Sequence, residues 1–206
     1  EVDISVCCMT YNHKDTIAQA LDSMLSQKTR YSFEIIVHDD ASTDNSAAII
    51  REYEQKYPHI FKPIYEIESI YKKGGFGAID NVMLHAINAT NAKYVAMCEG
   101  DDYWTNPLKL QKQVDFMESH EEYTLSCSAG KILTNNRFTH WGEVGREQDL
   151  TPEQLILGFW GYIPTASLFI RRNIFDVYPE FCKKCKVGDR PLKIFCSLVG
   201  KVHYFN

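Results

Sequence analysis

Short strand-like segments alternate with helical segments over residues 1–120, and this alternation limits the chain to a small set of folds. The strand-like segments are rich in Ile, Val, Tyr, Phe and Cys, and most are too short for a helix of ordinary length. Such runs are typical of strands buried on both faces, and strands joined through helices pair in parallel. We therefore predict an α/β fold with a mostly parallel central sheet flanked by helices. The predicted strands are residues 3–10, 33–37, 61–67 and 94–98.

Helical segments fill the intervals between these strands. Residues 17–25 place Ile, Ala, Leu and Met at helical spacing along one face. Further helices are expected at residues 46–57, 79–89 and 107–118. Thr43 and Asp44 are candidate N-caps for the first of these three.

Beyond residue 123 the alternation is less regular. No internal repeat or linker interrupts the sequence, so we predict a single domain over residues 1–206. The expected features here are strands at 125–129, 166–171 and 201–206, a turn at Asn135–Asn136, and helices that start at Thr151 and Gly188.

Composition excludes some classes of protein. The chain is 45% hydrophobic with a net charge of −5, which suits a globular domain and lacks the basic patches of a nucleic-acid-binding surface. No run of eighteen apolar residues is present, and no signal peptide is visible. Cys7, Cys8 and Cys98 fall in apolar, strand-like runs typical of buried thiols in a reducing compartment, so we expect a cytoplasmic protein. The sequence starts at Glu1 without Met, which indicates a piece of a longer chain.

Cys182 and Cys185 are most simply two incidental thiols, because a zinc site would need further ligands nearby.

Polar segments follow three of the predicted strands. They are residues 10–13 (TYNH), 38–44 (HDDASTD) and 99–104 (EGDDYW). Ligands of open parallel sheets bind beyond the carboxyl ends of the strands. We therefore expect these segments to converge on one crevice.

Carboxylates dominate this expected crevice. Asp39 and Asp40 could cap a helix, but two acids at a strand end also suit hydrogen bonds from a nucleobase. Asp101 and Asp102 could lie in a solvated loop, or could bind Mg²⁺ or Mn²⁺ together with phosphate oxygens. Asp189 could cap a helix or act as a general base.

A glycine-rich loop covers residues 74–77 and could let backbone amides approach phosphates. It matches neither the P-loop pattern nor the dinucleotide-binding G-x-G-x-x-G pattern, which counts against a nicotinamide-dependent dehydrogenase.

In this order, these segments resemble glycosyltransferase family 2, the inverting enzymes with the GT-A fold. The resemblance covers nearly the whole chain and is closest to bacterial enzymes that build surface polysaccharides. The matching stretches are SVCCMTYNHKDTIAQALDSMLSQ, FEIIVHDDASTDNS, AIDNVMLHAINATNAKYVAMCEGDDYW with NPLKLQKQVDF, and VGDRPLKIFCSLVGK.

The resemblance implies a role for each matching residue. Asp102 matches the metal-binding aspartate, although E-G-D-D replaces the strict D-x-D pattern, and Asp189 matches the catalytic base. Asp40 matches the uracil-binding aspartate. The other implied donor-site residues are Thr10, Tyr11, Asn12, Asp39, Lys73, Asn81, Asp101 and Trp104, the last with Tyr103 as a wall for a sugar.

The resemblance also implies an activity and an organisation. A sugar would pass from a nucleoside diphosphate sugar to a hydroxyl of a saccharide or lipid-linked acceptor, with Mn²⁺ or Mg²⁺ as cofactor. Residues 1–120 would form a Rossmann-like nucleotide-sugar-binding half, and residues 121–206 a mixed half that carries the acceptor side and the base. Family members usually continue beyond this point, so we expect a C-terminal segment to be missing and to mediate peripheral association with the inner face of the membrane.

Two other functions are compatible with these residues. A sugar-nucleotide pyrophosphorylase would carry a Gly-, Arg- and Lys-containing loop after the first strand, and residues 7–14 (CCMTYNHK) contain no glycine. A non-catalytic nucleotide-sugar-binding domain would retain the same acids without turnover. UDP is the expected nucleotide, and dTDP and GDP stay open because one aspartate pairs with several base edges.

Overall fold

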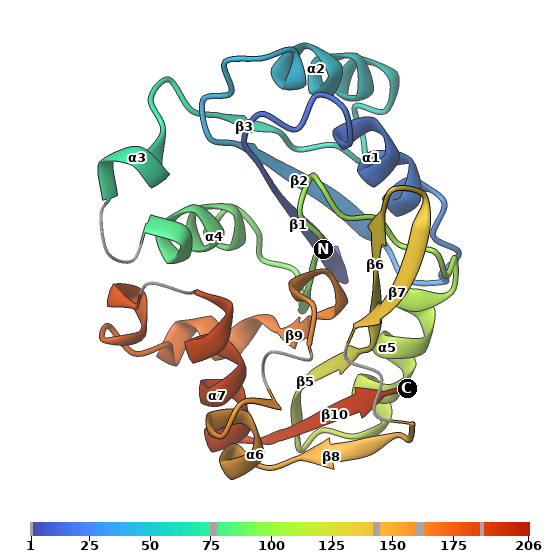
Figure 1. Cartoon of the computed structure of the whole chain (residues 1–206), viewed down its shortest axis with the longest axis vertical. Coiled ribbons are helices and arrows are strands. Elements are labelled where there is room, and N and C mark those ends of the chain that lie inside the picture. Colours follow the sequence, from blue (N-terminus) through green and yellow to red (C-terminus); the bar gives the residue numbers. More distant parts are fainter. Residues whose placement is uncertain (1, 75–77, 142–144, 160–162, 186–187) are drawn as a thin grey trace.

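Strand β1 (Ile4–Thr10) lies inside the parallel half of an eight-stranded sheet in the computed structural model (Figure 1). It pairs in parallel with β2 (Phe33–Asp39) and with β4 (Tyr94–Met97), and β2 pairs in parallel with β3 (Ile64–Tyr65). The predicted parallel α/β arrangement is thus confirmed. The structure describes residues 2–74, 78–141, 145–159, 163–185 and 188–206.

The second half of the chain adds strands of mixed direction, and the sheet order is β3-β2-β1-β4-β9-β5-β10-β8. Strand β9 (Phe169–Arg171) runs antiparallel to both of its neighbours, β4 and β5 (Tyr123–Ser128). Strand β10 (Lys201–Phe205) pairs in parallel with β5 and antiparallel with β8 (Gln148–Leu150).

Helices cover both faces of the sheet (Figure 1). Alternation along β1 directs Val6 and Cys8 into one core cluster and Cys7 into the other. The cluster that contains Val6 includes apolar side chains of α1 (Ile17–Leu25), α2 (Ser46–Lys56) and α5 (Lys109–Ser119). The cluster that contains Cys7 includes side chains of α4 (Ala78–Asn88), α6 (Pro152–Ile156) and α7 (Asp189–Val199). Burial on both faces explains why the strands are apolar throughout.

Local signals place several boundaries correctly. Thr151 forms a capping box with Gln154 at the start of α6. Asn135 and Asn136 both have positive φ, as a two-residue hairpin turn requires, and join β6 (Gly130–Thr134) to β7 (Arg137–Trp141). Helix α2 begins at Ser46 as predicted, but its N-cap is Asn45 and not Thr43 or Asp44. Asp44 instead accepts the hydrogen bond of the Ser46 amide at 2.9 Å from one residue earlier.

Other elements differ from the sequence-based expectation. The third strand shortens to two residues, and the short helix α3 (Ile70–Gly74) precedes α4. The expected strand at 166–171 begins as a 3₁₀ turn, Thr165–Ser167, before β9. Two more short 3₁₀ segments, Arg172–Val177 and Cys182–Lys184, follow β9. In the part of the chain that the structure describes, no helix is both long and apolar enough to cross a bilayer.

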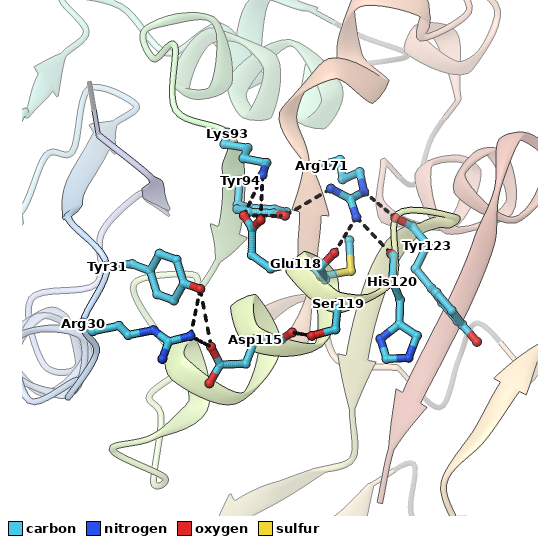
Figure 2. A network of polar contacts seen from close by, with 11 residues as sticks. Arg30, Tyr31, Lys93, Tyr94, Asp115, Glu118, Ser119, His120, Tyr123 and Arg171 are labelled. Atoms are coloured by element: carbon cyan, nitrogen blue, oxygen red, sulfur yellow. Dashed lines mark hydrogen bonds and ion pairs between the residues drawn. The ribbon is translucent and has the colours of Figure 1, made fainter.

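Arg171 joins the two halves of the sheet (Figure 2). Its guanidinium donates to the carbonyl oxygens of Tyr123 (2.6 Å), Met117 (2.6 Å) and His120 (3.0 Å), and to the Tyr94 hydroxyl (3.1 Å). Two of these carbonyls belong to the end of α5, where each otherwise accepts only one long backbone bond, from His120 at 3.4 Å and from Tyr123 at 3.3 Å. The Arg171 side chain on β9 therefore forms hydrogen bonds to β4, to β5 and to the end of α5.

We expect Arg171→Leu to lower the free energy of unfolding by about 2–4 kcal/mol, because it removes four hydrogen bonds from one charged donor group, three of them to backbone carbonyls. Urea unfolding followed by circular dichroism measures the change. Arg30→Leu is the matched control, since Arg30 forms an exposed ion pair with Asp115 at 2.8 Å and exposed pairs contribute little. Equal losses in the two variants would contradict the bridging role of Arg171.

Candidate active site

The loops that follow β1 and β2 are joined through Asn12. The backbone amide of Asn12 donates to the Ser42 hydroxyl at 2.9 Å, and its side-chain oxygen accepts from the Thr43 amide at 2.8 Å. Asn12 has a φ of 57°, a conformation that asparagine tolerates better than most residues. Two of the predicted polar segments therefore meet at the carboxyl edge of the sheet.

Asp39 and Asp40 are both buried, but their carboxylates have different partners. Both oxygens of Asp40 are engaged at the start of α3, where they accept from the Ser69 hydroxyl (2.6 Å) and the Ile70 amide (2.6 Å). Asp39 accepts from the Ser42 amide through one oxygen at 3.3 Å. Its other oxygen, Oδ1, is buried and has no partner among the described residues. Asp39 thus presents the free acceptor of the pair.

A polar pocket of about 480 Å³ opens beside Asp39. Arg51 and Tyr65 line it, and the Arg51 guanidinium lies 4.5 Å from the centre of the Tyr65 ring. A planar base entering this pocket would meet an aromatic face, a cation and a buried carboxylate oxygen. A second cavity, of about 370 Å³ and lined partly by Lys93 and Arg171, contains none of the predicted site residues.

The acidic loop after β4 contacts the loop after β1. The Gly100 amide donates to the Met9 carbonyl at 2.9 Å, and the Thr16 hydroxyl donates to the Gly100 carbonyl at 2.9 Å. A Cβ on Gly100 would lie 2.7 Å from Thr10 Oγ1 and 2.8 Å from His13 Nδ1. Glycine is therefore required for this close approach.

Negative charge accumulates on this loop. Burial, then the charges of Asp102 and Asp101, raise the pKa of Glu99 from 4.5 to about 8. Burial and the charge of Asp101 also raise the pKa of Asp102. The His13 imidazole lies 3.9 Å from the more exposed Asp101 carboxylate. A divalent cation would relieve this repulsion, and carboxylate oxygens are the ligands that Mg²⁺ and Mn²⁺ prefer.

Asp189 lies in the first turn of α7 and pairs with a buried lysine. Lys193 donates to the Asp189 carboxylate at 2.6 Å and to the Ile163 carbonyl at 2.6 Å. The Thr165 hydroxyl is 3.4 Å from the same carboxylate oxygen. The charge of Asp189 contributes to the raised pKa of Glu99, which places Asp189 within electrostatic range of the acidic loop. The N-cap of α7 is Gly188, and Asp189 is the first residue of the helix.

Two other predicted residues, Lys73 and Trp104, are placed differently. Lys73 is exposed and pairs with Glu68, whereas its neighbour Lys72 contacts the Tyr11 hydroxyl. Trp104 is only 8% exposed, and its indole N–H donates to the Ala166 carbonyl at 2.7 Å, which leaves little of the ring for a sugar.

Part of the glycine-rich loop, residues 75–77, and the side chain of Asn81 lie outside the described residues.

Lys193 was missed as a site residue, and His13 was given no role beyond its place in the polar segment at residues 10–13. His13 immediately follows the predicted loop residues, so its place beyond the strand end was a usable signal. Lys193 is four residues after Asp189, the spacing that brings two side chains to the same face of a helix. Its burial and its pairing with Asp189 follow only from tertiary packing.

The raised pKa of Glu99 predicts a pH-dependent stability in EDTA. Between about pH 4.5 and pH 8, folded Glu99 keeps a proton that the unfolded chain has lost, so the stability it contributes declines as pH rises through this interval. We expect Glu99→Gln to reduce the decline, measured by urea unfolding near both ends of the interval. Glu121→Gln, at an exposed position, is the control. An unchanged decline in Glu99→Gln would show that Glu99 titrates normally.

Comparisons with known proteins identify the family of this chain. Residues 5–178 match the family described as Glycosyl transferase family 2. The chain is 34% identical over 120 residues to UDP-Glc:alpha-D-GlcNAc-diphosphoundecaprenol beta-1,3-glucosyltransferase WfaP of Escherichia coli, covering 58% of this chain and 43% of that protein. It spans about half the length of the curated relatives it matches.

Solved structures show the same fold. Staphylococcus aureus TarS 1-349 in complex with UDP has a TM-score of 0.72 at 19% identity, over 98% of this chain and 57% of that one. The mannosyltransferase PcManGT from Pyrobaculum calidifontis, in complex with GDP-Man and Mn²⁺, has a TM-score of 0.64 at 15% identity, over 100% of this chain and 57% of that one. The chain has the GT-A fold and belongs to glycosyl transferase family 2.

Proposed function

We propose that this chain transfers a sugar, with inversion, from a UDP-sugar to a hydroxyl of a saccharide or lipid-linked acceptor in bacterial polysaccharide synthesis. The observation that supports it best is the meeting of three features at one sheet edge. These are the pocket beside Asp39, the acidic loop that contains Asp102, and Asp189 on α7. The nucleotide and the lipid-linked acceptor are suggested by TarS with UDP and by the name of WfaP. Such an acceptor would bring the protein to the inner face of the membrane.

Asp39 and the loop after β1 would hold the nucleotide. A uracil N–H donated to Asp39 Oδ1 would satisfy a buried acceptor that has no partner in the described structure. Asp40 would act indirectly, since its carboxylate fixes the start of α3. Tyr11, held by Lys72, and Asn12 would line the same side of the site.

Asp102 would hold the divalent metal ion, with Asp101 beside the donor sugar or ribose. The residues fit such an ion because burial and mutual repulsion already raise the pKa of Asp102 and of Glu99. When bound, Mn²⁺ or Mg²⁺ would neutralise charge on the diphosphate leaving group. PcManGT, of the same fold, was solved with Mn²⁺.

Asp189 would take the proton from the acceptor hydroxyl as that oxygen attacks the anomeric carbon. The attack comes from the face opposite the departing diphosphate, so the configuration inverts. The buried ammonium of Lys193 holds one carboxylate oxygen, which orients the other for the acceptor. Lys193 is therefore a positioning residue in this proposal.

Asp189→Asn tests the base. General base catalysis typically contributes ~10²–10⁴-fold, so we expect kcat for UDP release from UDP-glucose and UDP-N-acetylglucosamine to fall by that order while UDP binding is retained. The substitution also weakens the charge partner of Lys193, so a thermal melt must confirm folding. Asp176→Asn removes an exposed carboxylate that pairs with Arg172 and is the matched control. Turnover within a few-fold of the unmodified chain would refute the base assignment.

Asp102→Asn tests the metal ligand. We expect calorimetric binding of UDP in Mn²⁺ to weaken at least about tenfold, the effect of losing ~1.4 kcal/mol of metal-linked affinity. EDTA should weaken binding to the unmodified chain in the same way, and Asp176→Asn should leave it unchanged. Activity and UDP binding that both resist EDTA would rule out a metal role. Tight UDP binding without UDP release from any donor would instead favour a non-catalytic binding domain.

A further inference from the structure

Three side chains of metal-ligating type meet beside the carboxyl end of β2. His38 is the penultimate residue of β2, Glu66 follows β3 directly, and His85 is on α4. The Glu66 Oε1 atom lies 3.1 Å from His38 Nε2 and 2.9 Å from His85 Nδ1. All three ligand atoms lie within 4.8 Å of one another. The sequence gives no hint of this cluster, because its members are separated by at least one secondary-structure element.

These distances suit a tetrahedral transition metal ion. Zinc bonds to histidine nitrogen and carboxylate oxygen at ~2.0–2.2 Å, which separates neighbouring ligand atoms by roughly 3.3 Å. The observed separations from Glu66 are within a few tenths of an ångström of that value. Two histidines and one glutamate are also a ligand set that zinc uses with one position left for water.

Burial supports a ligand role for His38. Its side chain has no exposed surface, and its only polar contact among the described residues is with Glu66, since Nδ1 has no partner there. Burial lowers the pKa of His38, which favours the neutral imidazole that a metal requires. The His85 side chain is 48% exposed and leaves a route from solvent.

The cluster is distinct from the donor site but connected to it. Adjacent side chains of a strand point to opposite faces, so His38 points away from the side that Asp39 occupies. The Glu66 amide donates to the Asp39 carbonyl at 2.9 Å, and Glu66 also lines the pocket beside Asp39. An ion held by the cluster would tie α4 to the ends of β2 and β3, at the edge of that pocket.

We propose that His38, Glu66 and His85 form a structural site for a zinc-class divalent ion, separate from the donor-site metal. Imidazole ligands select Zn²⁺ or Co²⁺ over Mg²⁺ and Mn²⁺, which prefer oxygen. The ion clamps α4 against the sheet and fixes the Glu66 carboxylate. This role goes beyond the proposed transfer reaction and does not depend on it.

Co²⁺ titration tests the site directly. The chain with Asp102→Asn and Cys185→Ser, which removes the donor-site ligand and a partly exposed thiol, is stripped with EDTA and titrated with Co²⁺. We expect one equivalent to produce the intense visible bands of tetrahedral Co²⁺, displaced by Zn²⁺ and not by Mg²⁺. Zn²⁺ should also raise the melting temperature, as any ligand that binds only the folded state does.

Adding His85→Gln supplies the decisive comparison, because this exposed histidine can be replaced with little risk to folding. Loss of a direct ligand should weaken Zn²⁺ binding by about 100-fold or more, and the Co²⁺ bands should disappear. His59→Gln, at an exposed position outside the cluster, is the matched control and should leave both unchanged. No bands in the parent, or bands that persist in His85→Gln, would overturn the proposal and leave a hydrogen-bonded His–Glu–His group.

Discussion

Parallel pairing of β2, β1 and β4 is the constraint on which the site depends. Because β1 lies between the other two strands in register, all three end at one edge of the sheet. This brings together a buried carboxylate with a free oxygen at Asp39, the loop of Asn12, and the acidic loop that begins at Glu99. The second half of the chain then adds α7, whose Asp189 lies within electrostatic range of that loop. The same parallel strand pairing therefore determines both the fold of this half and the position of the site.

This arrangement brings several carboxylates together at a buried part of the sheet edge, where their ionised forms are disfavoured. Burial and neighbouring acids raise the pKa of Glu99 and of Asp102, so the metal-free loop resists full ionisation. A bound cation would restore the ionised form, which couples metal binding to proton release. On α7, the buried side chain of Lys193 is paired with the Asp189 carboxylate. Removing one partner of a pair with a buried charge is costly, which makes the start of α7 sensitive to substitution of either residue.

Sequence patterns predicted the parallel half of the sheet because each strand, turn and helix there is encoded by adjacent residues. They also identified most of the acids at the strand ends. They could not predict that β9 enters antiparallel between β4 and β5, since that placement depends on Arg171 reaching residues 48 to 77 positions away. Nor could they show that Asp39 rather than Asp40 keeps a free oxygen, because the start of α3 engages Asp40. Local sequence patterns do not show which residues form hydrogen bonds across long sequence distances.

In the proposed function, one sheet edge binds a nucleoside diphosphate together with a metal ion. A crystal structure of the chain with UDP and Mn²⁺, with anomalous data collected for manganese, tests it most directly. We expect an anomalous peak at bonding distance from Asp102, with the uracil ring in the pocket beside Asp39. A manganese ion bound elsewhere while the acidic loop holds none, or a uracil ring outside that pocket, would contradict it.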